Sequence, residues 1–293
     1  MEPAGKTILI FGGRTGLLGQ ALTKTFAKAG ANVIALSSKD GDVIDQIQVQ
    51  KLLVEHSPDV VINATAYTQV DLAEDQEELA FTLNATVPPL LAAQAARIGA
   101  LFIHYSTDFV FRGDKTEPYT ENDAPGAMSV YGISKNDGEQ GLLKLGYPDT
   151  LIIRISWLFG PGKINFVEKI LSLAAERDRL TVVNDQTGSP SYAPDVADGT
   201  LELIRNDARG LFHLSNSGQT TWHGLASAAV ELAGLNCEVA PVPTSAYPTK
   251  AIRPKYSVLD LSRYRTATNA NPRPWEEALR EYVQNELGYN ASN

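Results

Sequence analysis

Short apolar runs alternate with longer amphipathic segments through the first half of the chain. The first run, Ile8–Phe11, ends at a group of glycines, and apolar residues then recur with helical spacing over Gly16–Ala29. Short continuous apolar runs are typical of strands that are buried on both faces, as in a parallel sheet. The same pattern predicts strands at Asn32–Leu36, Val60–Asn63, Leu101–Tyr105 and Leu151–Ile155, and helices at Ile44–His56, Glu77–Gly99 (with a break or a new start at Pro88 and Pro89) and Ser129–Leu145.

The glycines after the first strand, Gly13, Gly16 and Gly19, have the spacing G-x-x-G-x-x-G. A strand, a glycine-rich turn and a helix in this order form the phosphate-binding unit of dinucleotide-binding folds. We expect Gly13 to turn the chain, Gly16 to leave room for a pyrophosphate, and Gly19 to let the helix pack closely on the sheet. The first N–H groups of the helix, around Leu17 and Leu18, would then face the phosphates.

The alternation predicts an α/β fold, a doubly wound parallel sheet of Rossmann-like type with helices on both faces. The second half is less regular, because Gly160-Pro161-Gly162 interrupts the alternation and prolines divide the chain from Pro241 to Pro274. We therefore expect a dinucleotide-binding domain over residues 1–158 and a smaller C-terminal substrate-binding lobe over residues 159–293, with some segments returning to the core. The elements predicted there are helices at Asn165–Glu176, Asp195–Arg205 and Trp222–Leu232, and strands at Leu180–Val183 and Leu211–Leu214.

The end of the second predicted strand bears on the choice of cofactor. An acidic residue usually stands there and binds the 2′-hydroxyl of NAD, but this chain has Ser37-Ser38-Lys39. Two hydroxyls and a cation suit a 2′-phosphate, so Ser37 and Lys39 favour NADPH, with NADH left open. Asp42 and Val43 are candidates to contact the adenine. Ala64-Thr65-Ala66, after the third strand, would let the dinucleotide lie across the sheet edge.

Two further segments carry candidate chemistry. Tyr131 and Lys135 are four residues apart and share one face of a predicted helix. A phenol with a pKa near 10 is a poor proton donor at neutral pH, and a neighbouring ammonium would lower that pKa. Both groups would also contact the nicotinamide half of a cofactor. Ser106-Thr107-Asp108 follows the fourth strand, where Thr107 is placed to polarise a carbonyl and Asp108 to hold a sugar hydroxyl.

Composition limits the class of partner. The chain has 25 Lys and Arg against 34 Asp and Glu, a formal net charge of -9, whereas a nucleic-acid surface needs a basic patch. Its single cysteine, Cys237, excludes an intramolecular disulfide and fits a reducing compartment. The N-terminus lacks the pattern of a signal peptide, and no apolar run reaches the roughly 18–20 residues of a membrane helix. We expect a cytoplasmic protein that binds a small molecule, and neither nucleic acid nor membrane.

With these segments in place, the chain resembles the extended short-chain dehydrogenase/reductases, and within them the dTDP-4-dehydrorhamnose reductase family. The resemblance covers nearly the whole chain. It rests on the glycine pattern and on segments that include 63–71, 106–113, 131–139, 155–157, 165–167, 184–190, 221–223, 242–248 and Arg253-Pro254.

The resemblance implies hydride transfer from a nicotinamide to C4 of a dTDP-bound 4-keto-6-deoxyhexose, giving dTDP-L-rhamnose. Tyr131 would protonate the forming alkoxide, and Lys135 would lower the Tyr131 pKa and hold the ribose. Thr107 would orient the carbonyl. Asp108 and Trp157 would contact the sugar. Arg253 is a candidate to bind the diphosphate, because a guanidinium matches phosphate oxygens.

Several alternatives and exclusions accompany this interpretation. A dehydratase of the same fold would need Glu where Phe109 stands, which counts against it. A 4-epimerase, a reductase of another 4-keto-6-deoxysugar and a non-catalytic regulatory subunit remain open, and so does a homodimer. Some family members bind a divalent metal through an acidic residue after the third glycine, but Gln20 follows Gly19 here, so no metal is expected. His104 is expected to be a packed residue of a strand, and Trp222 is left between core and site.

Overall fold

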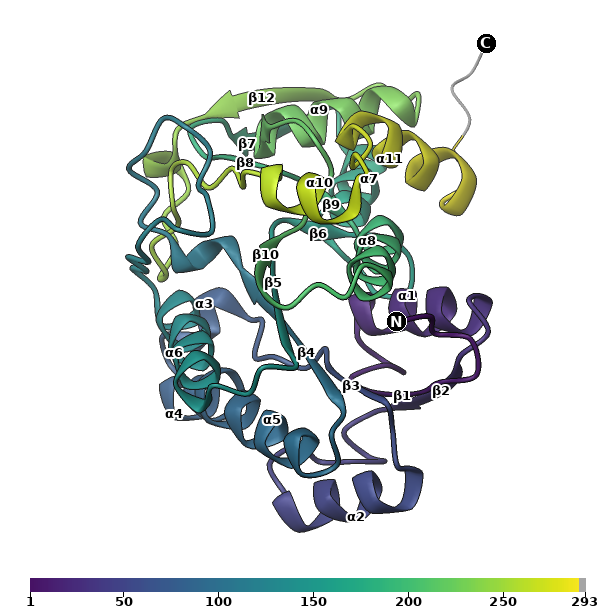
Figure 1. Ribbon diagram of the computed structural model, residues 1–293. Helices are drawn as coiled ribbons and strands as arrows, with labels where there is room; N and C mark the ends of the chain where they lie inside the picture. The colour runs from purple at the N-terminus through teal and green to yellow at the C-terminus, as the bar shows by residue number, and fades with distance from the viewer. Residues whose placement is uncertain (290–293) are drawn as a thin grey trace.

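The computed structural model describes residues 1–289, and a six-stranded sheet forms its centre (Figure 1). Every pairing in this sheet is parallel. The predicted doubly wound parallel sheet is therefore confirmed, and β1 lies where the strand order reverses, which is where such folds bind ligands. The strands are β1 (Thr7–Phe11), β2 (Asn32–Leu36), β3 (Val60–Asn63), β4 (Leu101–Thr107), β5 (Thr150–Ile155) and β10 (Gly210–His213), in the order β10-β5-β4-β3-β1-β2.

Helices cover both faces of the sheet. On one face, α1 (Leu17–Lys28) and α8 (Ala193–Arg205) pack on residues such as Ile8 and Ile10. On the other, α2 (Gln46–His56), α5 (Val87–Arg97) and α6 (Val130–Leu145) pack on residues such as Leu9 and Phe11. Successive residues of each strand thus enter opposite cores, and each large apolar side chain buried there stabilises the fold by about 1.5–3 kcal/mol.

The prolines before β4 mark a new helical start and not a break in the chain. After α3 (Val70–Ala73), α4 (Glu77–Phe81) runs through a π-helical segment, Thr82–Thr86, directly into α5. Pro88 and Pro89 lie in the first turn of α5, where missing N–H groups are tolerated. The π-helical segment also positions α6, because a Cβ added to Gly138 would lie 2.1 Å from the carbonyl oxygen of Asn84.

A separate apolar core forms in the second half, at the top of Figure 1. Here α7 (Phe166–Glu176), α9 (Trp222–Leu232) and α11 (Trp275–Glu281) pack around β7 (Arg179–Val183) and β12 (Glu238–Val242). The predicted elements α7, β7 and α9 are present, and β12 and α11 also form in the segment that prolines were expected to divide. Pro241 lies inside β12, which pairs on one side only, with β7, so a missing N–H costs no ladder bond there.

The remaining elements are short. They are β6 (Leu158–Phe159) with β9 (Ser191–Tyr192), β8 (Thr187–Gly188) with β11 (Thr220–Thr221), α10 (Ser262–Thr268), the turns at Asp108–Val110 and Thr244–Ala246, and a π-helical segment at Tyr282–Glu286. From the second half, α8, α10 and β10 contact the main sheet or its covering helices. The final residues of the predicted lobe, 290–293, lie outside the described part. No helix within residues 1–289 is long and apolar enough to cross a membrane.

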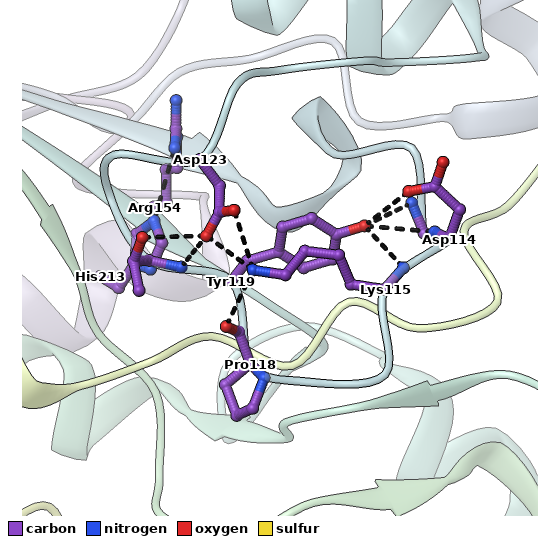
Figure 2. Close-up of polar contacts among 9 residues, drawn as sticks. Asp114, Lys115, Pro118, Tyr119, Asp123, Arg154 and His213 are labelled. Atoms are coloured by element: carbon purple, nitrogen blue, oxygen red, sulfur yellow. Dashed lines mark hydrogen bonds and ion pairs between the residues drawn. The ribbon is translucent and has the colours of Figure 1, made fainter.

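The loop from β4 to α6 is organised by Tyr119 (Figure 2). Its hydroxyl accepts N–H groups from Gly113 and Asp114, at 3.0 and 3.2 Å, and its ring stacks on Phe111 with 4.1 Å between centroids. Lys115 binds both carboxylate oxygens of Asp123, at 2.8 and 2.9 Å, and holds the pKa of Asp123 at about 2. The loop is thereby held in place where it enters α6.

Candidate active site

A cavity of about 670 Å³ opens at the carboxyl edge of the sheet, in the size range of small-molecule sites. It brings together residues that the sequence leaves far apart. Of the predicted site residues, it is lined by Gly16, Leu17, Leu18, Ala64, Thr65, Ala66, Thr107, Asp108, Tyr131, Lys135, Trp157 and Arg253. The lining does not include Gly13, Gly19, Ser37, Lys39, Asp42 or Val43.

The glycine-rich turn has one more member than the sequence indicated. Gly12 has a φ of 83°, so it rather than Gly13 turns the chain off β1, and its added Cβ would lie 2.9 Å from the carbonyl oxygen of Ala64. Gly13 is instead needed for packing, because an added Cβ would lie 2.9 Å from that of Ala35. Gly16 begins α1 with no side-chain cap, so the first N–H groups of the helix have no side-chain acceptor there. This arrangement fits a dinucleotide phosphate.

Gly19→Ala is expected to destabilise the fold and weaken cofactor binding together. An added Cβ would lie 2.1 Å from the carbonyl oxygen of Gly12, so α1 must move away from the turn. Overpacking of this kind costs about 1–3 kcal/mol. Thermal unfolding and NADPH fluorescence titration measure the two effects. Lys24→Ala, at an exposed position of the same helix, is the control, and equal behaviour of the two variants would contradict the prediction.

Tyr131 and Lys135 occupy the first half of α6, and both line the cavity beside Thr107. The Ser129 hydroxyl caps this helix by accepting the N–H of Gly132 at 3.2 Å. The Lys135 amine is 2 % exposed and donates to the carbonyl oxygen of Tyr105 at 2.5 Å. Burial lowers the pKa of Lys135 to about 8.

The expected lowering of the Tyr131 pKa is wrong for the free protein. Burial raises the pKa of Tyr131 to about 12; the hydroxyl of Thr107 opposes this shift, and the charge of Asp108 adds to it. Burial affects the pKa of Tyr131 more than the Lys135 ammonium does, because the Lys135 amine is directed to Tyr105 and His104. The pKa of Lys135 is itself lowered by burial. Tyr131 therefore keeps its proton throughout the neutral pH range.

Asp108 is buried, and burial raises its pKa to about 6. It accepts hydrogen bonds from Thr107 at 3.1 Å and from Ser257 at 2.5 Å. Ser257 comes from the C-terminal half and was not singled out by the sequence, since an isolated serine in a loop carries no signal of its own. Through this pair, the Ser-Thr-Asp segment at the end of β4 is joined to the C-terminal half of the chain.

Three aromatic residues, Trp157, Trp222 and Phe166, form an aromatic wall along the cavity. Trp157 and Trp222 stack with 3.7 Å between centroids and 8° between planes, and Phe166 packs on Trp222 at 4.6 Å. All three line the cavity, so Trp222 belongs to the site as well as to the second core. Trp157 has a φ of 45°, a conformation that costs about 1–3 kcal/mol and that is found mainly where function needs it.

Arg253, from the C-terminal part of the chain, lines the cavity but is already paired. Its guanidinium binds both carboxylate oxygens of Asp71, at 3.0 and 2.6 Å, and the pairing lowers the pKa of Asp71. A diphosphate at this position would compete with Asp71 for the same donors. Asp71 belongs to the segment 63–71, and its contact with Arg253 could not be predicted from the sequence.

An acidic residue, Asp40, lies in the turn that follows the end of β2. Asp40 accepts from the Ser37 hydroxyl at 2.6 Å and from Arg14 at 3.1 Å, which lowers the pKa of Asp40. Lys39 is exposed, and Ser38 lines the cavity.

The two predicted adenine contacts differ in burial. Asp42 is exposed and accepts the N–H of Ile44 at 3.0 Å. Val43 is only 6 % exposed and packs in the core of the sheet, away from the cavity.

The position at which some family members carry a metal ligand has another role here. Gln20 donates to the carbonyl oxygen of Gly162 at 3.1 Å and links α1 to the loop before α7. That loop adds Lys163 and Ile164 to the cavity lining, neither of which the sequence pattern marked. Within residues 1–289, no group of three or more His, Cys, Asp or Glu side chains is placed to hold a metal ion.

Comparisons with known proteins cover almost the whole chain. The family described as RmlD substrate binding domain matches residues 6–287. A Bacillus subtilis protein named spore coat polysaccharide biosynthesis protein SpsK is 40% identical, covering 95% of this chain and 97% of its own. The dTDP-4-dehydrorhamnose reductase of Salmonella typhimurium is 40% identical, covering 94% and 96%. A dTDP-4-keto-6-deoxy-D-glucose reductase of Streptomyces niveus is 33% identical, covering 91% and 93%.

Solved structures show the same likeness. The crystal structure of dTDP-4-dehydrorhamnose reductase from Bacillus anthracis, in complex with NADP, is 33% identical with a TM-score of 0.92, covering 96% of this chain and 99% of that one. The resemblance inferred from the motifs is thus confirmed over almost the whole length. The glycine-rich turn, the Tyr131–Lys135 helix and the aromatic wall all lie inside the matched region, and the chain belongs to the RmlD substrate binding domain family.

Proposed function

We propose that this protein is an NADPH-dependent reductase that converts dTDP-4-dehydro-L-rhamnose to dTDP-L-rhamnose. One observation carries the proposal. A single cavity joins the glycine-rich turn after β1 to Thr107, Tyr131 and Lys135, so a cofactor phosphate site and a proton donor face the same space. The names of the Salmonella and Bacillus anthracis relatives support this substrate and cofactor.

The residues present fit a dinucleotide. Gly12 and Gly16 leave space where a Cβ would meet backbone atoms, and the uncapped start of α1 faces that space. Leu17 and Leu18 would offer backbone N–H groups to the phosphates, and Ala64–Ala66 would border the dinucleotide along the sheet edge. When bound, the nicotinamide supplies the hydride.

The chain's own groups would act on the carbonyl of the substrate. Tyr131 holds a proton at its Oη atom and would donate it to the oxygen of C4. Thr107 would polarise that carbonyl, while Asp108 and Trp157 would contact the sugar. Arg253 would bind the diphosphate after release from Asp71. A positioned proton donor contributes about 10²–10⁴-fold to such a reaction.

The test is a spectrophotometric assay of nicotinamide oxidation with dTDP-4-keto-6-deoxyglucose. Turnover that requires an added 3,5-epimerase supports reduction of the L-sugar. Turnover without the epimerase indicates a D-sugar reductase, the second candidate, which the 33% identity to the Streptomyces niveus enzyme favours. Absence of turnover under both conditions contradicts both reductase proposals. A larger enzyme that co-purifies with the inactive chain would then support a regulatory subunit.

Lys39→Ala is expected to weaken NADPH binding more than NADH binding. Lys39 is exposed beside Ser38 at the end of β2, and only NADPH carries the 2′-phosphate that its cation would attract. Fluorescence titration with each cofactor measures the ratio of affinities. Lys51→Ala, on the exposed side of α2, serves as the control. An equal loss for NADPH and NADH would remove Lys39 from cofactor selection.

Three predictions remain as made from the sequence. They are the boundary between the two parts at residue 158, a homodimer as an alternative to a monomer, and a cytoplasmic location, which the single Cys237 favours.

A further inference from the structure

His104 is more than a packed residue of β4. It is 0 % exposed and lies beside Asn63, its register partner on the parallel strand β3. Its two ring nitrogens face different groups. Nδ1 lies 3.2 Å from the Asn63 amide nitrogen, and Nε2 lies 3.2 Å from the Lys135 amine. A single buried side chain thus connects the lysine of the candidate active site to β3.

The amide of Asn63 is oriented by Thr65. Its oxygen accepts the Thr65 backbone N–H at 3.1 Å and the Thr65 hydroxyl at 2.6 Å. A backbone N–H can only donate, so the atom facing it is the amide oxygen. The amide nitrogen of Asn63 therefore donates to His104, and Nδ1 of a neutral His104 must accept. The ring proton is then on Nε2, directed at Lys135.

The Nε2–H tautomer of His104 limits the charge that Lys135 can carry. An Nε2–H group and an ammonium are both donors, so they cannot bond each other. The arrangement of Asn63, His104 and Thr65 is satisfied when Lys135 is a neutral amine that accepts from Nε2 and donates to the carbonyl oxygen of Tyr105. An ammonium would require Nε2 to accept, which moves the ring proton to Nδ1 and sets it against the Asn63 amide nitrogen.

We propose that Asn63 and His104 are positioning residues for Lys135, and that they link its charge to the Asn63–Thr65 contact at the edge of the cavity. Protonation of Lys135 would change the tautomer of His104 and turn the Asn63 amide away from Thr65. Because Thr65 lines the cavity where the cofactor is expected, occupancy there and the charge of Lys135 would influence each other. Only the expected effect on turnover rests on the proposed function; the coupling between His104 and Lys135 does not.

The charged groups around Lys135 are few. On α6 itself, Glu139 raises the pKa of Lys135, although Glu139 is held by Arg154 of β5 at 2.9 and 2.5 Å. Tyr131 precedes it on the same helix, and Asp108 lies near Tyr131 after β4. Burial in this setting brings the pKa of Lys135 to about 8, so both charge states are accessible near neutral pH.

The direct test is a long-range ¹H–¹⁵N NMR titration of the histidine-labelled unmodified protein. The chain has only four histidines, and loss of one set of signals in His104→Gln assigns His104. We expect the Nε2–H tautomer at high pH and a change to Nδ1–H as Lys135 becomes charged, with no such change in Lys135→Met. A single tautomer at every pH, or a positively charged ring, would overturn the proposal.

Kinetics test the link to catalysis. His104→Phe keeps a ring of similar size but removes both hydrogen bonds, and we expect kcat to fall by about 10- to 10²-fold with a displaced pH profile. His104→Gln, which can donate and accept, should recover part of the loss. Ile103→Val, on the same strand but facing the opposite core, is the matched control for stability. Equal kcat and pH profile in His104→Phe and Ile103→Val would overturn the positioning role.

The two measurements separate the two proposals. Failure of the unmodified protein to turn over substrate would contradict the proposed function, yet the NMR titration would still decide how His104 and Lys135 are coupled. The titration also needs no stable His104→Phe protein, so a variant that does not fold leaves the proposal testable.

Discussion

Tyr131→Phe is expected to lower kcat by about 10²–10⁴-fold while NADPH still binds. Burial keeps the Tyr131 hydroxyl protonated at neutral pH, so it holds the proton that reduction of a carbonyl consumes. Phenylalanine keeps the edge-to-face contact with Phe109, whose ring centroid lies 5.5 Å away, so the cavity wall stays in place. The measurement is steady-state nicotinamide oxidation combined with NADPH fluorescence titration.

Tyr147→Phe is the matched control for loss of a tyrosine hydroxyl. That group donates to the carbonyl oxygen of Ala100 at 2.9 Å, at the opposite end of β4. Its removal should leave kcat unaffected. Near-parent turnover in Tyr131→Phe would remove Tyr131 from the role of proton donor. A parallel loss in both variants would instead attribute the effect to folding.

Arg154→Met is expected to destabilise the protein by about 3–5 kcal/mol. Arg154 on β5 and Glu139 on α6 form a two-bond ion pair, with side chains 2 % and 1 % exposed. Methionine would leave the Glu139 carboxylate buried without its partner. The guanidinium also lies 4.9 Å from the ring centroid of Phe111. It lies 3.4 Å from His213, and Figure 2 labels both Arg154 and His213. Urea unfolding measures the change in free energy.

Two further variants distinguish burial of charge from loss of volume. The double variant Glu139→Leu with Arg154→Met removes both charges and should recover much of the lost stability. Arg205→Met breaks an exposed pair with Glu202, both side chains being 37% exposed, and should cost about 0–1 kcal/mol. If Arg154→Met cost no more than Arg205→Met, the buried pair would not be the element that holds α6 to β5.

Local patterns were sufficient for the elements of the sheet. The strand Val60–Asn63 and the helix Trp222–Leu232 were predicted with the bounds that the structure has. Both elements depend on residues that are close in the sequence, because a buried apolar run or an amphipathic repeat consists of neighbouring residues. At Pro88 and Pro89 the pattern left a break or a new start open, and the structure has a new start, because α5 begins at Val87 directly after a π-helical segment. The π-helical segment before them is packed against Gly138 of a distant helix, which the local sequence does not report.

The candidate site likewise combines motifs that local sequence predicts with contacts between distant segments. Three groups of site residues could be predicted from local spacing alone, because each is a contiguous motif: the glycine-rich turn, the Tyr131–Lys135 pair and the Ser-Thr-Asp segment. The contacts of the site residues depend on how distant segments pack: Ser257 with Asp108, Asp71 with Arg253, and Trp222 with Trp157.

The charge state of Lys135 shows why. Its pKa depends on burial, and its hydrogen bonds depend on His104 and Tyr105, which the register of β3 and β4 and the packing of α6 bring beneath it. Sequence spacing therefore determines which groups are available for proton transfer, whereas desolvation and partners from other strands determine their protonation, since both arise only when the chain is packed.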